Sequence, residues 1–196
     1  MVKLFVEGGG DSRYLHARCR EGFRRFLERA GLGGRMPRIV ACGGRGDAYD
    51  SFKTSVENER KYLPFLLVDS ETTVTAESPW EHLKTSPGDG WEKPENAGDD
   101  QCHLMVQCME SWFLADIGAL REYFKDGFLE DALPKNVTIE SIEKSELFKS
   151  LKHATSKCQK RTYSKGDHSF ALLGPIDPKQ VSSKCHWAER FFKEYG

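Results

Sequence analysis

The feature that most constrains the fold is an alternation of short apolar runs with longer amphipathic stretches. Four apolar runs have the length of buried strands, and they span 2–6, 38–42, 65–68 and 102–108. The stretches between them, such as 12–30, carry apolar residues at helical spacing. Strands that alternate with amphipathic helices are typical of an α/β fold with a mainly parallel sheet. The sequence therefore predicts an α/β protein of about four strands flanked by helices.

The length of the chain favours one domain. Its 196 residues, 38% of them hydrophobic and 30% charged, suffice for one sizeable core, so we expect a single domain over 1–196. Three prolines and two tryptophans fall in 72–100, which is typical of a loop insertion or a mobile loop. Helical patterns dominate the last third, and we expect a helical extension at about 135–196.

Membrane and secretory segments are not expected. No stretch approaches the roughly 18 to 20 apolar residues of a membrane helix, and the first apolar run is too short for a secretory signal. We therefore expect a cytoplasmic protein with no membrane partner. The six cysteines form no CxxC pair, which favours reduced, structural thiols over the alternatives of a thiol enzyme or a zinc site.

Basic residues concentrate in two segments. Six arginines stand against two glutamates between Arg13 and Arg29, and six basic residues lie between Lys149 and Lys165 with no acidic one. If both segments meet on one face, they form a patch suited to a polyanion such as nucleic acid. The alternative is that they are solvated helix faces.

Acidic residues follow three of the four predicted strands: Glu7, then Asp69 and Glu71, then Glu110. The carboxyl ends of parallel strands share one edge of a sheet, where ligands bind. Asp69 and Glu71, two apart in an extended segment, can point the same way. Clustered carboxylates need a cation to stay ionised, and all-oxygen ligands favour Mg²⁺ or Mn²⁺. Helix caps are the alternative, because the first turn of a helix already favours an acid such as Glu110.

Two glycine-rich turns adjoin these strands. The turn at Gly8–Gly10 lacks the GK[ST] of a P-loop and the GxGxxG of a dinucleotide fold. Glycines let a substrate approach the backbone closely, so Gly9 and Gly10 are candidate contacts for nucleic acid. In the second turn, Arg45 stands among glycines as a candidate phosphate donor.

The motifs "VEGGGD" and "LLVDSE" resemble those of the TOPRIM (topoisomerase-primase) domain. With "CGGRGDAYDSF", "MVQCMESWFLAD" and "YSKGDHSFAL", the chain resembles a family of small bacterial TOPRIM-like proteins. Members of that family are often encoded beside ABC-type ATPases in phage-defence loci. The resemblance implies a TOPRIM-like (Rossmannoid) sheet and a separate ATPase partner, since this chain has no Walker motif.

The resemblance also implies roles for single residues. Glu7 would be the general base or a metal-linked carboxylate, Asp69 and Glu71 metal ligands, and Glu110 a further ligand. Lys165 is similar in placement to a lysine that stabilises transition-state charge, although it could equally be a surface lysine. Asp11 matches the acidic end of the glycine turn, which would contact nucleic acid together with Gly9, Gly10 and Arg45. One departure is Asp-Ser-Glu in place of Asp-x-Asp, which leaves a second metal position in doubt.

These observations predict a Mg²⁺-dependent nuclease of TOPRIM type that cleaves DNA or RNA, with Glu7, Asp69 and Lys165 as catalytic residues. It would be the effector of an ATPase-linked anti-phage defence system. One alternative is a non-catalytic subunit that binds nucleic acid or docks on the ATPase, and another is a different phosphoryl-transfer enzyme. Three tryptophans could stack on bases, although Trp112 has the helical spacing of a core residue.

Overall fold

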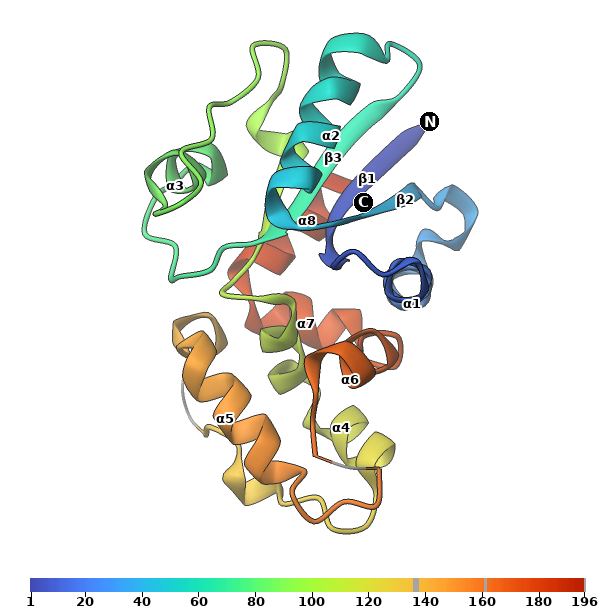
Figure 1. Ribbon diagram of the computed structural model, residues 1–196, viewed down its shortest axis with the longest axis vertical. Helices are drawn as coiled ribbons and strands as arrows, with labels where there is room; N and C mark the ends of the chain where they lie inside the picture. The colour runs from blue at the N-terminus through green and yellow to red at the C-terminus, as the bar shows by residue number, and fades with distance from the viewer. Residues whose placement is uncertain (136–137, 161, 196) are drawn as a thin grey trace.

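The computed structural model describes residues 1–135, 138–160 and 162–195, and its centre is a four-stranded, fully parallel sheet (Figure 1). The order of the strands across the sheet is β2-β1-β3-β4. This arrangement confirms the predicted α/β class with a parallel sheet. The strands are β1 (Val2–Gly9), β2 (Arg38–Gly43), β3 (Leu63–Asp69) and β4 (Cys102–Met105).

The strand order places a topological switch point between β1 and β3. The chain leaves β1 for β2 on one side and reaches β3 on the other, so the two crossovers diverge there. Val6 pairs with Ala41 of β2 and with Leu67 of β3. The ends of β1 and β3 therefore lie side by side where open α/β sheets bind ligands.

The two faces of the sheet are covered by different helices. Leu4 belongs to the cluster of buried residues that includes the apolar side of α1 (Arg13–Leu27). Phe5, its neighbour in β1, belongs to a second cluster with α2 (Arg45–Asn58), where its ring meets that of Phe52. Successive side chains of a strand point to opposite faces, so β1 alone anchors both layers.

Helix α1 begins after Ser12, as the sequence pattern indicates, but it ends at Leu27, before the end of the pattern at position 30. Ser12 caps its first turn by accepting a hydrogen bond from the backbone N–H of Leu15 at 3.4 Å. At its far end the chain continues through a π-helical turn (Glu28–Leu32) and a 3-10 turn (Gly33–Arg35). Gly31 breaks the helix with a φ of 88°, a conformation that glycine adopts readily.

The segment 72–100 is packed against the sheet layer. It contains α3 (Pro79–Thr85), and its two tryptophans, Trp80 and Trp91, are only 4% and 9% exposed. Trp112 is also buried. These three rings fill the core, so they are not available to stack on bases, and the apolar spacing reflects packing alone.

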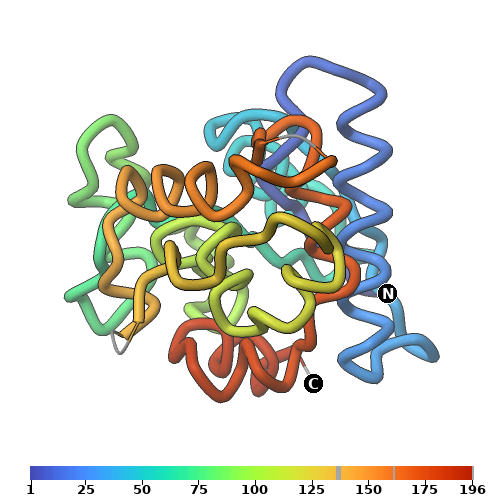
Figure 2. Tube along the Cα trace, turned by 90° about the horizontal axis from the view of Figure 1, so that it is seen from below, coloured from blue at the N-terminus to red at the C-terminus, as the bar shows by residue number. Residues whose placement is uncertain are grey.

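The chain beyond β4 consists of helices and loops in the residues described. Figures 1 and 2 show α4 (Ile117–Phe124), α5 (Lys144–Ala154) and α6 (Lys165–Leu173) beyond the carboxyl ends of the strands. No helix in the described part of the chain has the length and apolar character to cross a membrane. The other elements after β4 in the described residues are α7 (Pro178–Lys184), α8 (His186–Tyr195) and 3-10 helices at Met109–Ala115, Glu130–Ala132 and Ile139–Ser141.

Candidate metal centre

Glu7 and Asp69 meet at the switch point of the sheet. Glu7 lies near the end of β1, and its Oε2 accepts a hydrogen bond of 3.2 Å from the backbone N–H of Asp69, the last residue of β3. Both side chains are largely buried, with 16% and 4% of their surface exposed. Parallel pairing of two adjacent strands therefore delivers two carboxylates to one point.

The carboxylate of Asp69 is held by groups from the C-terminal half of the chain. Its Oδ1 accepts a hydrogen bond of 2.9 Å from the backbone N–H of Met109. Its Oδ2 lies 3.5 Å from the ammonium of Lys144 and 3.8 Å from that of Lys165. The helical part of the chain thus closes over the strand ends and supplies two cations.

Glu110 is fully buried in the 3-10 helix that follows β4. Its Oε1 accepts hydrogen bonds from Ser169 at 2.8 Å and from the hydroxyl of Tyr163 at 3.2 Å. Its Oε2 has no hydrogen-bond partner among the described residues, and the nearest cation, Lys165, is 4.0 Å away. A buried carboxylate oxygen without a partner is costly, so this atom is suited to a bound cation.

These side chains surround one cavity of about 170 Å³. Its walls come from β1, β3, the 3-10 helix and α6, so distant parts of the sequence converge on it. Of the residues that the sequence singled out, those lining it are Glu7, Gly9, Gly10, Asp69, Glu110 and Lys165. The cavity therefore combines three carboxylates, one ammonium and the glycine turn.

Glu71 lies at the edge of this group. It does not follow Asp69 in an extended strand, as the spacing suggested, because β3 ends at Asp69 and Glu71 has a φ of 65°. One of its oxygens still lies within 4.8 Å of oxygens of Glu7 and Asp69. Its Oε1 accepts a hydrogen bond of 2.7 Å from Lys144, so this part of the cluster already holds a cation of the chain itself.

Arg45 holds the strand ends together. Its guanidinium donates to the backbone carbonyl of Asp69, pairs with Asp89, and lies 3.5 Å from the Oε2 of Glu7. The group also lies over the ring of Trp91, 5.0 Å from its centroid. Arg45 does not line the cavity, and its guanidinium is already engaged by these contacts within the chain.

The glycine turn is shaped mainly by packing. A Cβ at Gly8 would lie 2.9 Å from the ring of Phe170, and one at Gly9 would lie 2.4 Å from the ring of His16. Gly10 faces open space instead. Asp11, at the end of the turn, is exposed and is not part of the cavity wall. The first two glycines therefore let α1 and α6 approach β1, and only the third leaves room for a ligand.

Burial and mutual repulsion disfavour the charged forms of the central pair. Burial raises the pKa of Glu7, repulsion by Asp69 raises it further, and Arg45 opposes the shift. Burial also raises the pKa of Asp69; Lys165 and Lys144 lower it, while Glu110 raises it. Burial lowers the pKa of Lys165, but attraction by Glu110 and Asp69 outweighs this and the net shift is upward. The cluster therefore has an unmet demand for positive charge.

The donors fit a hard divalent cation. Two groups of side chains bring their ligand atoms within 4.8 Å of one another: Glu7 with Asp69 and Glu71, and Asp69 with Cys108 and Glu110. Burial first, and then Asp69 and Glu110, raise the pKa of Cys108, so its thiol stays protonated and is a poor ligand. The remaining donors are carboxylate oxygens, which suit Mg²⁺ or Mn²⁺.

Three residues of the centre were not predicted from the sequence: Lys144, Tyr163 and Ser169. Ser169 lies one helical turn after Lys165, so helical spacing was a usable signal for it. Tyr163 lies before α6, where helical spacing gives no such signal. Lys144 lies in the acidic stretch "IESIEKSE", which resembles an ordinary solvated helix start and does not mark it as a site residue.

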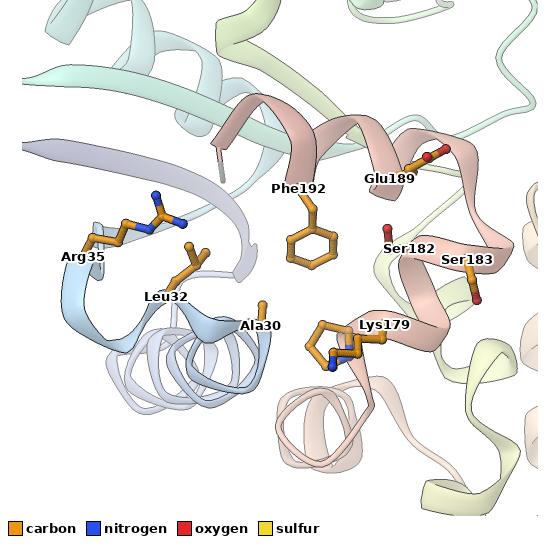
Figure 3. Close-up of a pocket in the computed structure, with 9 residues that line it drawn as sticks. Ala30, Leu32, Arg35, Lys179, Ser182, Ser183, Glu189 and Phe192 are labelled. Carbon is orange, nitrogen blue, oxygen red and sulfur yellow. The ribbon is translucent and has the colours of Figure 1, made fainter.

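A different cavity, of about 470 Å³, lies where the turns after α1 meet α7 and α8 (Figure 3). Arg35 and Lys179 border it, and Glu189 is its one acidic residue. None of the residues predicted for the metal site lines it. The cavity is therefore separate from the carboxylate cluster.

Comparison with known proteins places the chain in a family. No curated protein and no solved structure matches it. One family model, described as a domain of unknown function (DUF4276), matches residues 6–194 and so includes all the carboxylates of the centre. Because the match extends over nearly the whole chain, the protein belongs to the DUF4276 family.

Proposed function

We propose that this protein is a metal-dependent nuclease of TOPRIM type that cleaves phosphodiester bonds in DNA or RNA, with Mg²⁺ or Mn²⁺ as cofactor. The observation that carries the proposal is the cavity at the switch point, where Glu7, Asp69 and Glu110 converge with Lys165. The unpartnered oxygen of Glu110 supports a cation there. The order of the motifs along the chain, which resembles TOPRIM, supports the choice of reaction.

The positions of the side chains suggest a different catalytic role for each. Asp69 and Glu110 would hold the metal ion, which would polarise the phosphate and lower the pKa of a bound water. Glu7 has a raised pKa and lies on the cavity wall, so it is suited to take a proton from the attacking water. The ammonium of Lys165 faces the same space and would offset the charge that develops on the phosphate oxygens.

The partners follow from the same resemblance. We propose that the nuclease acts with a separate ABC-type ATPase in anti-phage defence, as the effector of the pair. Support comes from the likeness of the motifs to proteins encoded beside such ATPases, and from the lack of any Walker motif in this chain.

One observation favours a second function, a nucleic-acid-binding or ATPase-docking subunit without catalysis. Lys144 and Arg45 contact Glu7, Asp69 and Glu71, and they neutralise part of the cluster without any metal. A cluster fully compensated in this way would hold the fold together and bind no ion.

Incubation of the purified protein with plasmid, single-stranded DNA and tRNA, in buffer with Mg²⁺ or Mn²⁺, separates the two functions. The nuclease cleaves at least one substrate, and the Asp69→Asn and Glu110→Gln proteins do not. Glu57→Gln, which alters an exposed carboxylate on α2, is the matched control and should cleave like the parent. Equal cleavage by all four proteins would place the chemistry elsewhere, and binding without cleavage by the parent would favour the second function.

A further inference from the structure

Three hollows adjoin one another along α1 and α6. The first is the cavity of the metal centre, and Phe170 on its wall also lines the second, beside Tyr14 and Arg18. Arg25 is shared between the second and the third hollow, which continues to Arg29. The three hollows therefore adjoin one another in a row that begins at the carboxylates, and together they are called the α1–α6 groove below. Its wall residues used here are Tyr14, Arg18, Arg25, Arg29, Tyr123 and Phe170.

The two helices that border the groove are in direct contact. Figures 1 and 2 show α1 and α6 adjacent, and a Cβ at Gly22 would lie 2.6 Å from the carbonyl oxygen of Phe170. Arg18 donates a hydrogen bond of 2.7 Å to the carbonyl of Asp167 in α6. A fixed contact of this kind gives the groove a defined shape.

The charge of the groove is positive. Arg18, Arg29 and Lys160 take part in no ion pair of the described residues, so their charges remain available. The acids that face the groove, Glu21 and Glu28, are paired with arginines of α1 itself. The groove therefore presents an excess of cations to a ligand.

The second basic segment of the sequence reaches the same groove. The ammonium of Lys160 lies 4.0 Å from the centroid of the Tyr123 ring, and Tyr123 lines the third hollow with Arg25 and Arg29. The structure thus brings together one member of each basic segment, at the end of the groove away from the metal centre.

Two tyrosines provide flat surfaces along the groove. Tyr14 is 67% exposed, and the guanidinium of Arg18 lies 5.6 Å from its ring centroid. Tyr123 lies farther along, where only part of its surface is covered. An exposed tyrosine beside an arginine is a suitable platform for an unpaired base, since the base stacks on the ring and the arginine binds its phosphate.

We propose that the α1–α6 groove binds a single-stranded nucleic acid and leads it to the metal centre. This inference rests on the proposed function, and it adds the form of the substrate and its path. The backbone phosphates lie against Arg18, Arg29 and Lys160, and a base stacks on the exposed ring of Tyr14. A duplex keeps its bases paired and cannot use this ring, so the single strand is the preferred ligand.

Fluorescence anisotropy with labelled oligothymidylate and oligouridylate of about 20 nucleotides, in metal-free buffer, tests the groove. Tyr14→Ala should weaken binding about tenfold because a stacked base is lost. Arg29→Ala should reduce the slope of log affinity against log salt by about 0.7, the value for one phosphate contact. Arg20→Ala is the matched control, because Arg20 is exposed on α1 and lines none of the three hollows. Weaker binding by Tyr14→Ala and a smaller salt slope for Arg29→Ala, with parent-like binding by Arg20→Ala, support the groove for either oligonucleotide. The affinities of the parent protein for the two oligonucleotides show whether DNA or RNA is preferred.

Three outcomes would overturn the proposal that the groove binds a single strand. They are equal binding by the three variants, tighter binding of a hairpin duplex than of the single strand, and no binding by the parent protein. The Mg²⁺-induced shift in melting temperature, measured on the same samples, reports on the metal centre separately. A parent protein without that shift but with the expected binding pattern would refute the metal site and leave the groove standing. A normal Mg²⁺-induced shift of the parent protein with equal binding by all variants would refute the groove and leave the metal site standing.

Discussion

The carboxylate of Glu7 accepts a hydrogen bond from the backbone N–H of Asp69, and this contact joins the ends of β1 and β3 at the switch point of the sheet. Two largely buried acids are thereby fixed next to each other. Burial raises the pKa of both, and repulsion by Asp69 raises the pKa of Glu7 further. Such an arrangement costs stability unless a cation is bound, so stability reports on the function of the centre.

Glu7→Gln should stabilise the metal-free protein at about pH 8. The folded state raises the pKa of Glu7 above its ordinary 4.5, so this carboxyl contributes less stability as the pH rises above that value, and glutamine removes the loss. We expect a higher melting temperature than the parent at about pH 8, a smaller difference at about pH 5, and a reduced Mg²⁺-induced shift. A lower melting temperature at both pH values would show that the ionised carboxylate stabilises the fold.

Lys144→Met tests the cation that the chain supplies itself. Lys144 pairs with Asp69 and Glu71, and its side chain is 24% exposed, so the substitution should lower the stability of the metal-free protein by about 1 to 3 kcal/mol. Because the carboxylates then lack that cation, Mg²⁺ should raise the melting temperature more than it does for the parent. Lys149→Met, at an exposed position of the same helix, is the control. An unchanged Mg²⁺ response would mean that Lys144 and the metal do not compete.

Much of this architecture could be predicted from the sequence, because strands and helices have different apolar periods. The carboxylates could be predicted together for a topological reason: all parallel strands end at one edge of the sheet. Glu7, Asp69 and Glu110 need only that rule to meet. Their grouping did not depend on the exact ends of the helices, several of which the sequence pattern did not locate.

Contacts between distant parts of the chain could not be predicted in the same way. Lys144 reaches Asp69 across 75 residues, and Tyr163 reaches Glu110 across 53, through turns whose paths no periodicity specifies. The glycines next to Arg45 suggested a phosphate site, but the guanidinium faces Asp89 and the carbonyl of Asp69. The side to which a long side chain turns depends on tertiary partners.

Tyr163→Phe should lower kcat about 10-fold to 100-fold and leave KM unchanged, because the hydroxyl positions the Oε1 of Glu110 without contacting substrate. The loss of one buried hydrogen bond should cost only about 1 kcal/mol of stability. Tyr195→Phe removes a hydroxyl that bonds the carbonyl of Arg35, and it should leave kcat unaltered. Equal kcat values in Tyr163→Phe and parent would show that Glu110 needs no such positioning.

His103 should make the protein acid-sensitive independently of the metal centre. Burial, and then the charge of Arg190, lower the pKa of His103 from 6.5 to about 3. The unfolded chain therefore takes up a proton below 6.5 that the folded protein does not, and the stability from this group is lost as the pH falls. Between about pH 7 and about pH 5, the parent should lose about 2 kcal/mol more than His103→Phe, as measured by urea unfolding. Parallel pH profiles of the two proteins would contradict this assignment.

The central claim is that Asp69 and Glu110 hold a divalent metal ion beside Glu7, and anomalous diffraction from crystals soaked in Mn²⁺ tests it most directly. We expect an anomalous peak in the cavity at about 2.0 to 2.3 Å from carboxylate oxygens of Asp69 and Glu110. The same soak of Asp69→Asn crystals should show no peak there. A cavity without an anomalous peak in the parent crystals, with Lys144 and Lys165 still facing the carboxylates, would contradict the claim.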